Sequence, residues 1–270
     1  MVRIFKSILF STKMENLTDM ETIDYVRLTK SQKQEFKEID ELPNCLVLKC
    51  VEVNLTELPE LPNCKKLNCS FNQLTELPEL PNCKKLNCSF NQLTELPELP
   101  NCEYLVCSNN EIFMLPELPK CKYIECINNK IEELPELSKC EQLICSNNKI
   151  FELPSLPNCI TLKCGYNDLV NLPSLPNCKI LSCYNNELTE LPELPKCEYL
   201  KCFNNKLVKL PSLDNCEYLD CLKNKLTELP KLPKCEFLNC SDNSRLYYTR
   251  EFAERFDLSY PSPKVIHNKF

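Results

Sequence analysis

The sequence is dominated by one repeat unit that recurs along most of its length. The stretch LTELPELPNCKKLNCSFNQ occupies residues 55–73 and is repeated letter for letter over residues 74–92. One series of cysteines recurs at this same interval from Cys45 to Cys235, and a second does so from Cys50 to Cys240. Together these two series account for all 22 cysteines of the chain. A fixed period of about 20 to 50 residues predicts a solenoid of stacked repeats, so we expect one elongated domain.

Each unit has two halves with different local preferences. The first half follows the pattern C-x-x-L-x-C-x-x-N-x-L, and the second follows x-x-L-P-x-L-P-x. Alternation of apolar and variable residues around L-x-C is typical of a short strand whose leucine and cysteines point inward. The prolines of the second half prevent a regular helix, because proline lacks a backbone N–H and fixes φ. Each repeat is therefore predicted to contain a strand and an extended return leg close to polyproline II.

The segment before the repeats predicts an N-terminal cap. We assign residues 1–44 to an N-terminal extension and cap, with a short strand within residues 21–28 and a helix within residues 29–40. Thr29 or Ser31 can cap that helix, with a glutamine three residues further on. A solenoid needs such a cap because an open end exposes its core.

The segment after the repeats predicts a second cap. Residues 45–246 are assigned to the solenoid, with about 11 repeats, and residues 247–270 to a capping helix and a tail. Tyr248, Phe252 and Phe256 are spaced four residues apart, which places them on one face of a helix. Within the repeats, Val53 replaces the expected asparagine in the first unit and Arg245 replaces the expected leucine in the last. Both departures fall at the ends of the array, where capping is expected.

The repeat resembles the leucine-rich repeat, whose signature is L-x-x-L-x-L-x-x-N-x-L, with cysteine at two of the leucine positions. In one unit the matching residues are Cys64, Leu67, Cys69, Asn72 and Leu74. The LPELP leg is similar to the short repeats of bacterial secreted effectors, and the cysteine-rich form is similar to leucine-rich repeat proteins of giant DNA viruses of amoebae. The resemblance implies an α/β-type solenoid with a parallel sheet on its concave face and extended legs on its convex face. It also implies that the asparagines bond backbone groups of each turn.

The cysteines admit three explanations: zinc ligands, disulfides or buried free thiols. Zinc usually takes closely spaced pairs, often with histidine, whereas the pairs here are C-x4-C and the one histidine is His267 in the tail. Cysteines in register on neighbouring parallel strands do not easily reach the dihedral angle of a disulfide. Cysteine also buries as a small hydrophobe. The pattern therefore favours free thiols, no metal and no cofactor, and a reducing intracellular compartment such as a host cytoplasm.

Charge and composition exclude several classes of function. A net charge of -6 and a pI near 5.2 argue against nucleic acid as a partner. No apolar run is long enough to span a membrane, and the N-terminal residues do not form the apolar core of a signal peptide. The sequence offers no catalytic set, because it contains one histidine and one glycine, Gly165. We therefore expect a protein that is not an enzyme and that binds neither nucleic acid nor membrane.

The candidate binding residues are apolar and aromatic side chains at outward-facing positions of the strands. The position before the strand leucine and the position after the second cysteine vary between repeats, and nothing in the repeat requires them to be apolar. Large exposed apolar patches often mark contact sites, although aromatic residues also favour strands and pack between them. The candidate partner-binding residues are Tyr104, Tyr123, Ile127, Ile180, Tyr184, Tyr199, Phe203, Tyr218, Leu222 and Phe237.

These observations predict a non-catalytic scaffold that binds a protein partner on its concave face, mainly in the C-terminal half. We expect a monomer. Two alternatives remain at this stage. The chain could serve as the substrate-recognition part of a ubiquitin ligase whose catalytic domain lies on another protein, since some effectors with LPxLP repeats carry such a domain. It could also be a structural component of a virion or assembly.

Overall fold

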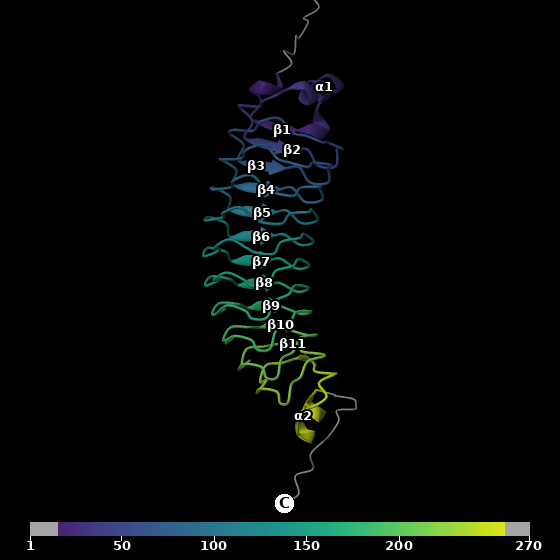
Figure 1. Ribbon diagram of the computed structural model, residues 1–270, viewed down its shortest axis with the longest axis vertical. Coiled ribbons are helices and arrows are strands. Elements are labelled where there is room, and N and C mark those ends of the chain that lie inside the picture. The colour runs from purple at the N-terminus through teal and green to yellow at the C-terminus, as the bar shows by residue number, and fades with distance from the viewer. Residues whose placement is uncertain (1–15, 257–270) are drawn as a thin grey trace, which may run out of the picture.

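The computed structural model describes residues 16–256, which form a slender column of parallel strands (Figure 1). One 12-stranded sheet runs the length of this column in the order β1 to β12, so each strand pairs with its neighbours in sequence. From β2 onward, each pairing joins equivalent positions of successive repeats, as in Lys66 beside Lys85. The predicted leucine-rich-repeat solenoid is therefore confirmed.

The strands are short and the helices few. The strands are β1 Thr22–Asp24, β2 Val47–Lys49, β3 Lys66–Asn68, β4 Lys85–Asn87, β5 Tyr104–Val106, β6 Tyr123–Glu125, β7 Gln142–Ile144, β8 Thr161–Lys163, β9 Ile180–Ser182, β10 Tyr199–Lys201, β11 Tyr218–Asp220 and β12 Phe237–Asn239. The helices are α1 Lys30–Glu38 and α2 Arg250–Arg255, with short 3-10 turns η1 Leu17–Asp19 and η2 Tyr25–Arg27.

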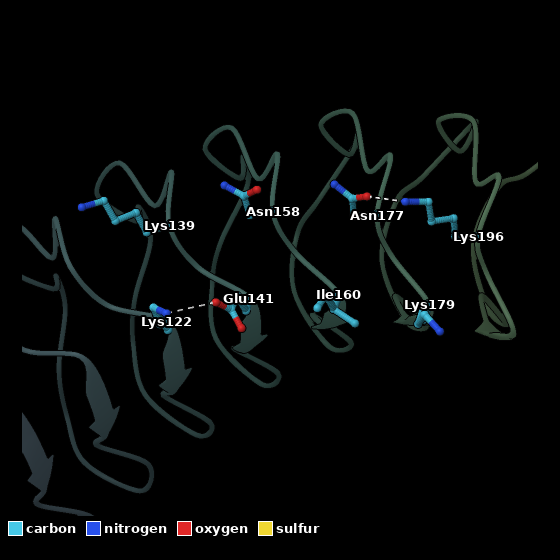
Figure 2. Close-up of a pocket in the computed structure, with 8 residues that line it drawn as sticks. All are labelled: Lys122, Lys139, Glu141, Asn158, Ile160, Asn177, Lys179 and Lys196. Atoms are coloured by element: carbon cyan, nitrogen blue, oxygen red, sulfur yellow. Dashed lines mark hydrogen bonds and ion pairs between the residues drawn. The ribbon is translucent and has the colours of Figure 1, made fainter.

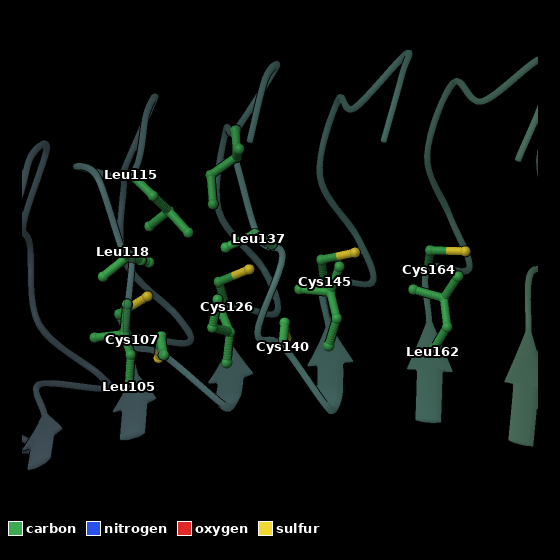
Figure 3. Close-up of a cluster of buried hydrophobic side chains, with 14 of the residues drawn as sticks. Leu105, Cys107, Leu115, Leu118, Cys126, Leu137, Cys140, Cys145, Leu162 and Cys164 are labelled. Atoms are coloured by element: carbon green, nitrogen blue, oxygen red, sulfur yellow. The ribbon is translucent and has the colours of Figure 1, made fainter. Parts of the chain in front are cut away.

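Every strand from β1 to β11 buries its central residue, and in most strands the residues on either side of it face outward. In β3, for example, Leu67 is 2% exposed while Lys66 is exposed and Asn68 is half-buried. The two cysteine series flank these leucines and lie in the same continuous core, part of which Figure 3 shows. This arrangement follows from the alternation of side chains along a strand. It leaves two outward positions per strand, and these form the surface on which the candidate site lies.

The return legs are extended, as the prolines predict. Between β2 and β12 the described residues contain no helix, and the legs return through leucines such as Leu61 and Leu80, both fully buried. Thin legs leave little distance between the sheet and the opposite wall. The small side chain of cysteine fits such a narrow core, which explains why it takes two of the leucine positions of each repeat.

The N-terminal cap extends the sheet by one strand. The strand expected within residues 21–28 covers only β1, because the Asp24 side chain accepts a hydrogen bond from the Val26 N–H and the chain turns there into η2. Helix α1 starts at the predicted capping box. The Thr29 hydroxyl accepts a hydrogen bond from the Gln32 N–H, and the Gln32 side-chain oxygen accepts one from the Thr29 N–H. Phe36 of α1 is 2% exposed and packs edge-on against Tyr25.

The C-terminal cap covers the last repeat. Tyr248, Phe252 and Phe256 all pack against the core, although α2 is shorter than their spacing predicts and contains only Phe252 of the three. The Arg255 guanidinium donates to the carbonyl of Leu232 at 2.7 Å, which ties α2 to the last return leg. The predicted tail, residues 257–270, lies outside the described residues. Among residues 16–256, no helix has the length and apolar character that crossing a membrane requires.

Candidate functional site

The turn that follows each strand is held by the repeated asparagine. In one repeat, the Asn148 amide group donates to the carbonyls of Cys126 and Cys145 at 2.9 and 3.0 Å, and its oxygen accepts from the Ile131 N–H at 3.1 Å. One side chain thus bonds backbone groups in two neighbouring repeats, and it is the partner of a buried N–H that would be costly to leave unpaired. The structural role predicted for this asparagine row is confirmed, so the row is not a binding site.

A second asparagine row lies on the rim beside the first. The backbone has a positive φ at this rim position in repeat after repeat, as at Asn128 and Asn147. Asparagine tolerates this left-handed region better than most residues. Along the rim the side chains bond one another, and the Asn128 amide donates to the Asn109 oxygen at 2.8 Å.

The cysteines form two parallel rows inside the solenoid. All 22 are free and buried, between Cys45 and Cys240. Removal from water disfavours a thiolate, so burial raises the pKa of Cys178 to about 11 and that of Cys45 to about 12. Among the described residues, no group of three or more cysteine, histidine or acidic side chains is arranged to hold a metal ion. These thiols are packing residues and offer no nucleophile.

The aromatic residues of β10, β11 and β12 form one continuous stack on the outward face of the sheet. The rings of Tyr199 and Tyr218 lie 4.4 Å apart and nearly parallel, and those of Tyr218 and Phe237 lie 4.3 Å apart. Tyr199 and Tyr218 are half-buried, whereas Phe237 is 45% exposed. Ile180 precedes Tyr199 in register on β9 and is also half-buried. Four of the predicted residues are therefore brought together along one column.

A second stack lies just after the ends of β9 and β10. The rings of Tyr184 and Phe203 stack at 4.5 Å, and Tyr166 meets Tyr184 edge-on at 5.4 Å. Leu222 occupies the same position in the next repeat and is half-buried. Gly165 makes room for this arrangement, because a Cβ atom on it would lie 2.7 Å from Cζ of Tyr184. Its φ is not positive, so this glycine is required for space and not for backbone conformation.

A charged column separates the two stacks. The Lys201 ammonium lies 5.3 Å from the ring centre of Tyr199 and 5.6 Å from that of Tyr218, within the range of cation–π attraction. A hydrogen bond with Tyr199 raises the pKa of Lys201, so the ammonium stays charged at neutral pH. Asp220 occupies the next position in register. The predicted patch is thus two aromatic columns with a lysine between them, and sequence analysis did not foresee that lysine.

The predicted residues of β5 and β6 and the residue that follows β6, namely Tyr104, Tyr123 and Ile127, are divided between two columns in the same way. Tyr104 and Tyr123 stack at 4.4 Å on β5 and β6, with Tyr104 37% exposed. The Tyr123 hydroxyl donates to a carboxylate oxygen of Glu125 at 2.8 Å. Burial, followed by the contact with Glu125, raises the pKa of Tyr123. Ile127 is half-buried at the strand end and its N–H donates to the Ser108 hydroxyl, so it lies in the other column.

A shallow groove of about 450 Å³ runs along the edge where the chain enters the strands (Figure 2). It is lined by Lys122, Lys139, Glu141, Asn158, Ile160, Asn177, Lys179 and Lys196. Most of its lysines are already paired within the fold. Lys122 lies 3.5 Å from Glu141, Lys179 lies 2.8 Å from Glu198, and Lys196 donates to the Asn177 oxygen at 2.7 Å. Two of the four lysine charges are thus balanced by carboxylates, whereas that of Lys196 is held by a neutral amide.

One pair of exposed aromatic residues is not among those predicted from the sequence. Phe71 and Phe90 are 49% and 45% exposed and stack at 4.3 Å on the rim beside β3 and β4. They occupy the second position after the second cysteine of their repeats, Cys69 and Cys88. Many other repeats carry asparagine at this position. The signal lies in the identical duplication, where a phenylalanine appears twice at a position that most other repeats fill with asparagine or a charged residue.

Solved structures with similar folds are leucine-rich repeat proteins. The leucine-rich effector protein YopM from Yersinia pestis is 32% identical with a TM-score of 0.56, over 74% of this chain and 72% of YopM. YopM from Yersinia enterocolitica is 31% identical with a TM-score of 0.50, over 73% of this chain and 56% of that one. No family model matches the sequence, and a search of curated proteins finds no match.

A third structure resembles this one in fold alone. The functional domain of InlJ from Listeria monocytogenes, which includes a cysteine ladder, is 23% identical with a TM-score of 0.53, over 70% of this chain and 51% of that one. The repeat period, the asparagine that bonds each turn and the similarity to YopM all indicate the same class of protein. The chain belongs to the leucine-rich repeat proteins, a class whose stacked repeats present an extended surface for binding other proteins.

Proposed function

We propose that this chain is a non-catalytic scaffold that binds a protein partner on the outward face of its sheet, mainly over β9 to β12. The observation that carries the proposal is the continuous stack of Tyr199, Tyr218 and Phe237 beside the stack of Tyr184 and Phe203. Buried aromatic residues dominate the energetics of many protein interfaces. Tyr104, Tyr123 and Ile127 are proposed as a lesser contact region on the same face.

The fold itself does not require aromatic residues at these positions. In β3 and β4 the same column holds Lys66 and Lys85, and the sheet continues through them without change of register. Lys201 adds a cation between the two stacks, so the surface suits a partner that offers apolar side chains with an acidic group among them. The buried free thiols support a reducing compartment as the place of action.

The test compares three forms of the full chain in affinity capture from a reducing cell lysate, followed by binding assays with the purified partner. The first form is unchanged, and the second carries Tyr199→Ser, Phe203→Ser and Tyr218→Ser. The third is a control, Phe113→Ser with Phe151→Ser, which removes two exposed rings that do not belong to either stack.

We expect the triple variant to bind the partner at least about 100-fold more weakly, because hot-spot side chains each contribute about 2 kcal/mol or more. The control should bind as the unchanged chain does. Equal binding by all three forms would refute the proposal. Recovery of only the chain itself would instead favour a structural, self-associating role.

A further inference from the structure

Five lysines form a positive surface at the N-terminal end of the sheet. They are Lys49, Lys65, Lys66, Lys84 and Lys85, all exposed on β2, β3 and β4 or just before β3 and β4, and are called the lysine surface here. Within residues 16–256, only two of them have an ionic partner: Lys49 lies 3.9 Å from Asp24, and Lys84 lies 3.7 Å from Glu103. Three ammonium groups thus lie unpaired on a protein whose net charge is -6.

Two exposed rings border this surface at the ends of the same strands. Phe71 and Phe90 have φ values of 58° and 56°, in the left-handed region. A non-glycine residue there costs about 1 kcal/mol or more, and asparagine, which other repeats use, would cost less. The two rings stack on each other, which offsets part of this strain, but each keeps nearly half of its surface exposed. The rings are placed where a partner can cover them.

The lysines and the rings have a fixed spacing. Lys66 and Lys85 pair in register on β3 and β4, and each ring follows its lysine by five residues. At about 3.3 Å per residue in a strand, this separation is at most about 16 Å along the surface. Between them lie Asn68 and Asn87, which are half-buried, and the buried Ser70 and Ser89. The strip between the charged end and the apolar end is therefore small and polar.

We propose that the lysine surface and the Phe71–Phe90 pair form a docking site for an acidic protein segment. The segment lies extended along β3 and β4, with two or more carboxylates against Lys65, Lys66 and Lys85. An apolar side chain about five residues away packs on the two rings. This site lies at the opposite end of the sheet from the aromatic stacks, so it goes beyond the proposed function and either site can fail without the other.

Charge selects a protein segment in preference to single-stranded nucleic acid. Asp24 and Glu103 flank the lysine surface on its two sides along the sheet. The positive region therefore spans only β2 to β4, which is about 10 to 15 Å at the usual strand spacing. A short acidic segment fits between these two carboxylates. A nucleic acid running across the strands would meet both of them, and one running along β3 and β4 would place further phosphates over the uncharged strip and the two rings.

The direct test is fluorescence anisotropy with the full chain and labelled peptides. The probe peptide carries two adjacent aspartates, a spacer of four small polar residues and a tryptophan. One control peptide has asparagines in place of the aspartates, a second has serine in place of the tryptophan, and a 12-nucleotide oligouridine is the nucleic-acid control. We expect the probe to bind at least about fivefold more tightly than any control at 50 mM salt, and to weaken when salt is raised to 300 mM.

Two double variants locate the site. Lys66→Gln with Lys85→Gln removes the charge, and Phe71→Asn with Phe90→Asn removes the rings. Both use residues that the same positions carry in other repeats, Gln142 and Asn147, so the fold is retained. Each should weaken probe binding at least about fivefold, whereas Lys209→Gln with Lys231→Gln, on exposed return-leg positions, should not.

Three outcomes overturn the proposal. The first is no binding of the probe, or equal binding of the probe and the neutral peptide. The second is equal weakening by the Lys209→Gln, Lys231→Gln control, which would indicate net charge alone. The third is tighter binding of oligouridine than of the probe. The Tyr199→Ser, Phe203→Ser, Tyr218→Ser variant should bind the probe normally, which separates this test from that of the proposed function.

Discussion

The single glycine of the chain shows how one residue can shape a surface. Gly165 stands in a column that holds serine in several repeats, and its missing Cβ gives the Tyr184 ring its place. That place lets Tyr184 contact Tyr166 on one side and Phe203 on the other. The aromatic column at the strand ends therefore depends on the absence of a side chain one repeat earlier.

Gly165→Ser should displace the Tyr184 ring and destabilise the protein by about 1 kcal/mol, because aromatic pairs contribute about 0.5 to 1.5 kcal/mol each. The measurement is the midpoint of unfolding in urea, taken for Gly165→Ser, Tyr184→Ser and the double variant. We expect the double variant to be no less stable than Tyr184→Ser alone, since serine then has nothing to displace. Additive losses in this cycle would show that Gly165 acts through the backbone instead.

At the scale of the repeat, the turn is the element that fixes each strand to its neighbours. Two adjacent asparagines share this turn but have different roles. Asn148 bonds the backbone of two repeats, whereas Asn147 is exposed, has a φ of 58° and bonds only side-chain and backbone groups at the rim.

Asn148→Ala should destabilise the protein by about 2 kcal/mol, because it leaves the buried Ile131 N–H without its partner. The Cys126 and Cys145 carbonyls each lose one donor but keep a second, from Asn129 and Asn167. Asn147→Ala serves as the matched variant in the same turn. It should cost only about 1 kcal/mol, the difference between alanine and asparagine in the left-handed region. Thermal unfolding followed by far-UV circular dichroism compares them, and similar losses for the two variants would contradict the assignment of roles.

The sequence predicts the main features of the repeat, because the period assigns one environment to each position. The strands around the leucines, the burial of Cys64 and Cys69 and the role of Asn72 follow from a single unit. Contacts between different columns do not follow from it. The position of Lys201 over two tyrosine rings, and the pairing of lysine with asparagine along the edge groove, depend on side-chain directions that the period leaves open.

The N-terminal cap shows the other limit of prediction. Helix α1 was predictable because its capping box is local in sequence. The early end of β1 depends on one side chain, Asp24, whose oxygen accepts from a backbone N–H two residues on. A residue that competes with the backbone in this way can end a strand inside an apolar run. The exposed phenylalanines of the rim are missed for a different reason, because the prediction considers only the two outward positions of each strand and not the rim position that follows them.

At the scale of the molecule, the cysteine rows link stability to pH. Burial raises the pKa of nearly all these thiols, to about 11 for Cys178 and Cys240 and to about 12 for Cys83. In the unfolded chain a thiol has a pKa of about 8.5. Above that pH the unfolded state loses protons that the folded state keeps. The contribution of the thiols to stability is therefore complete below about pH 8.5 and declines as pH rises toward the folded-state pKa values.

We predict that the protein unfolds in mild alkali. At about pH 9.5 each buried thiol lowers the free energy of unfolding by about 1.4 kcal/mol, so ten such thiols lower it by about 14 kcal/mol, comparable with the whole stability of a typical domain. The measurement is the urea midpoint at intervals from pH 7 to pH 9.5, with reductant and chelator present. It should fall steeply above pH 8.5 and recover on return to pH 7. This range lies below the ordinary pKa values of tyrosine and lysine, so the fall reports the thiols, and a midpoint that stays level to pH 9.5 would contradict the prediction.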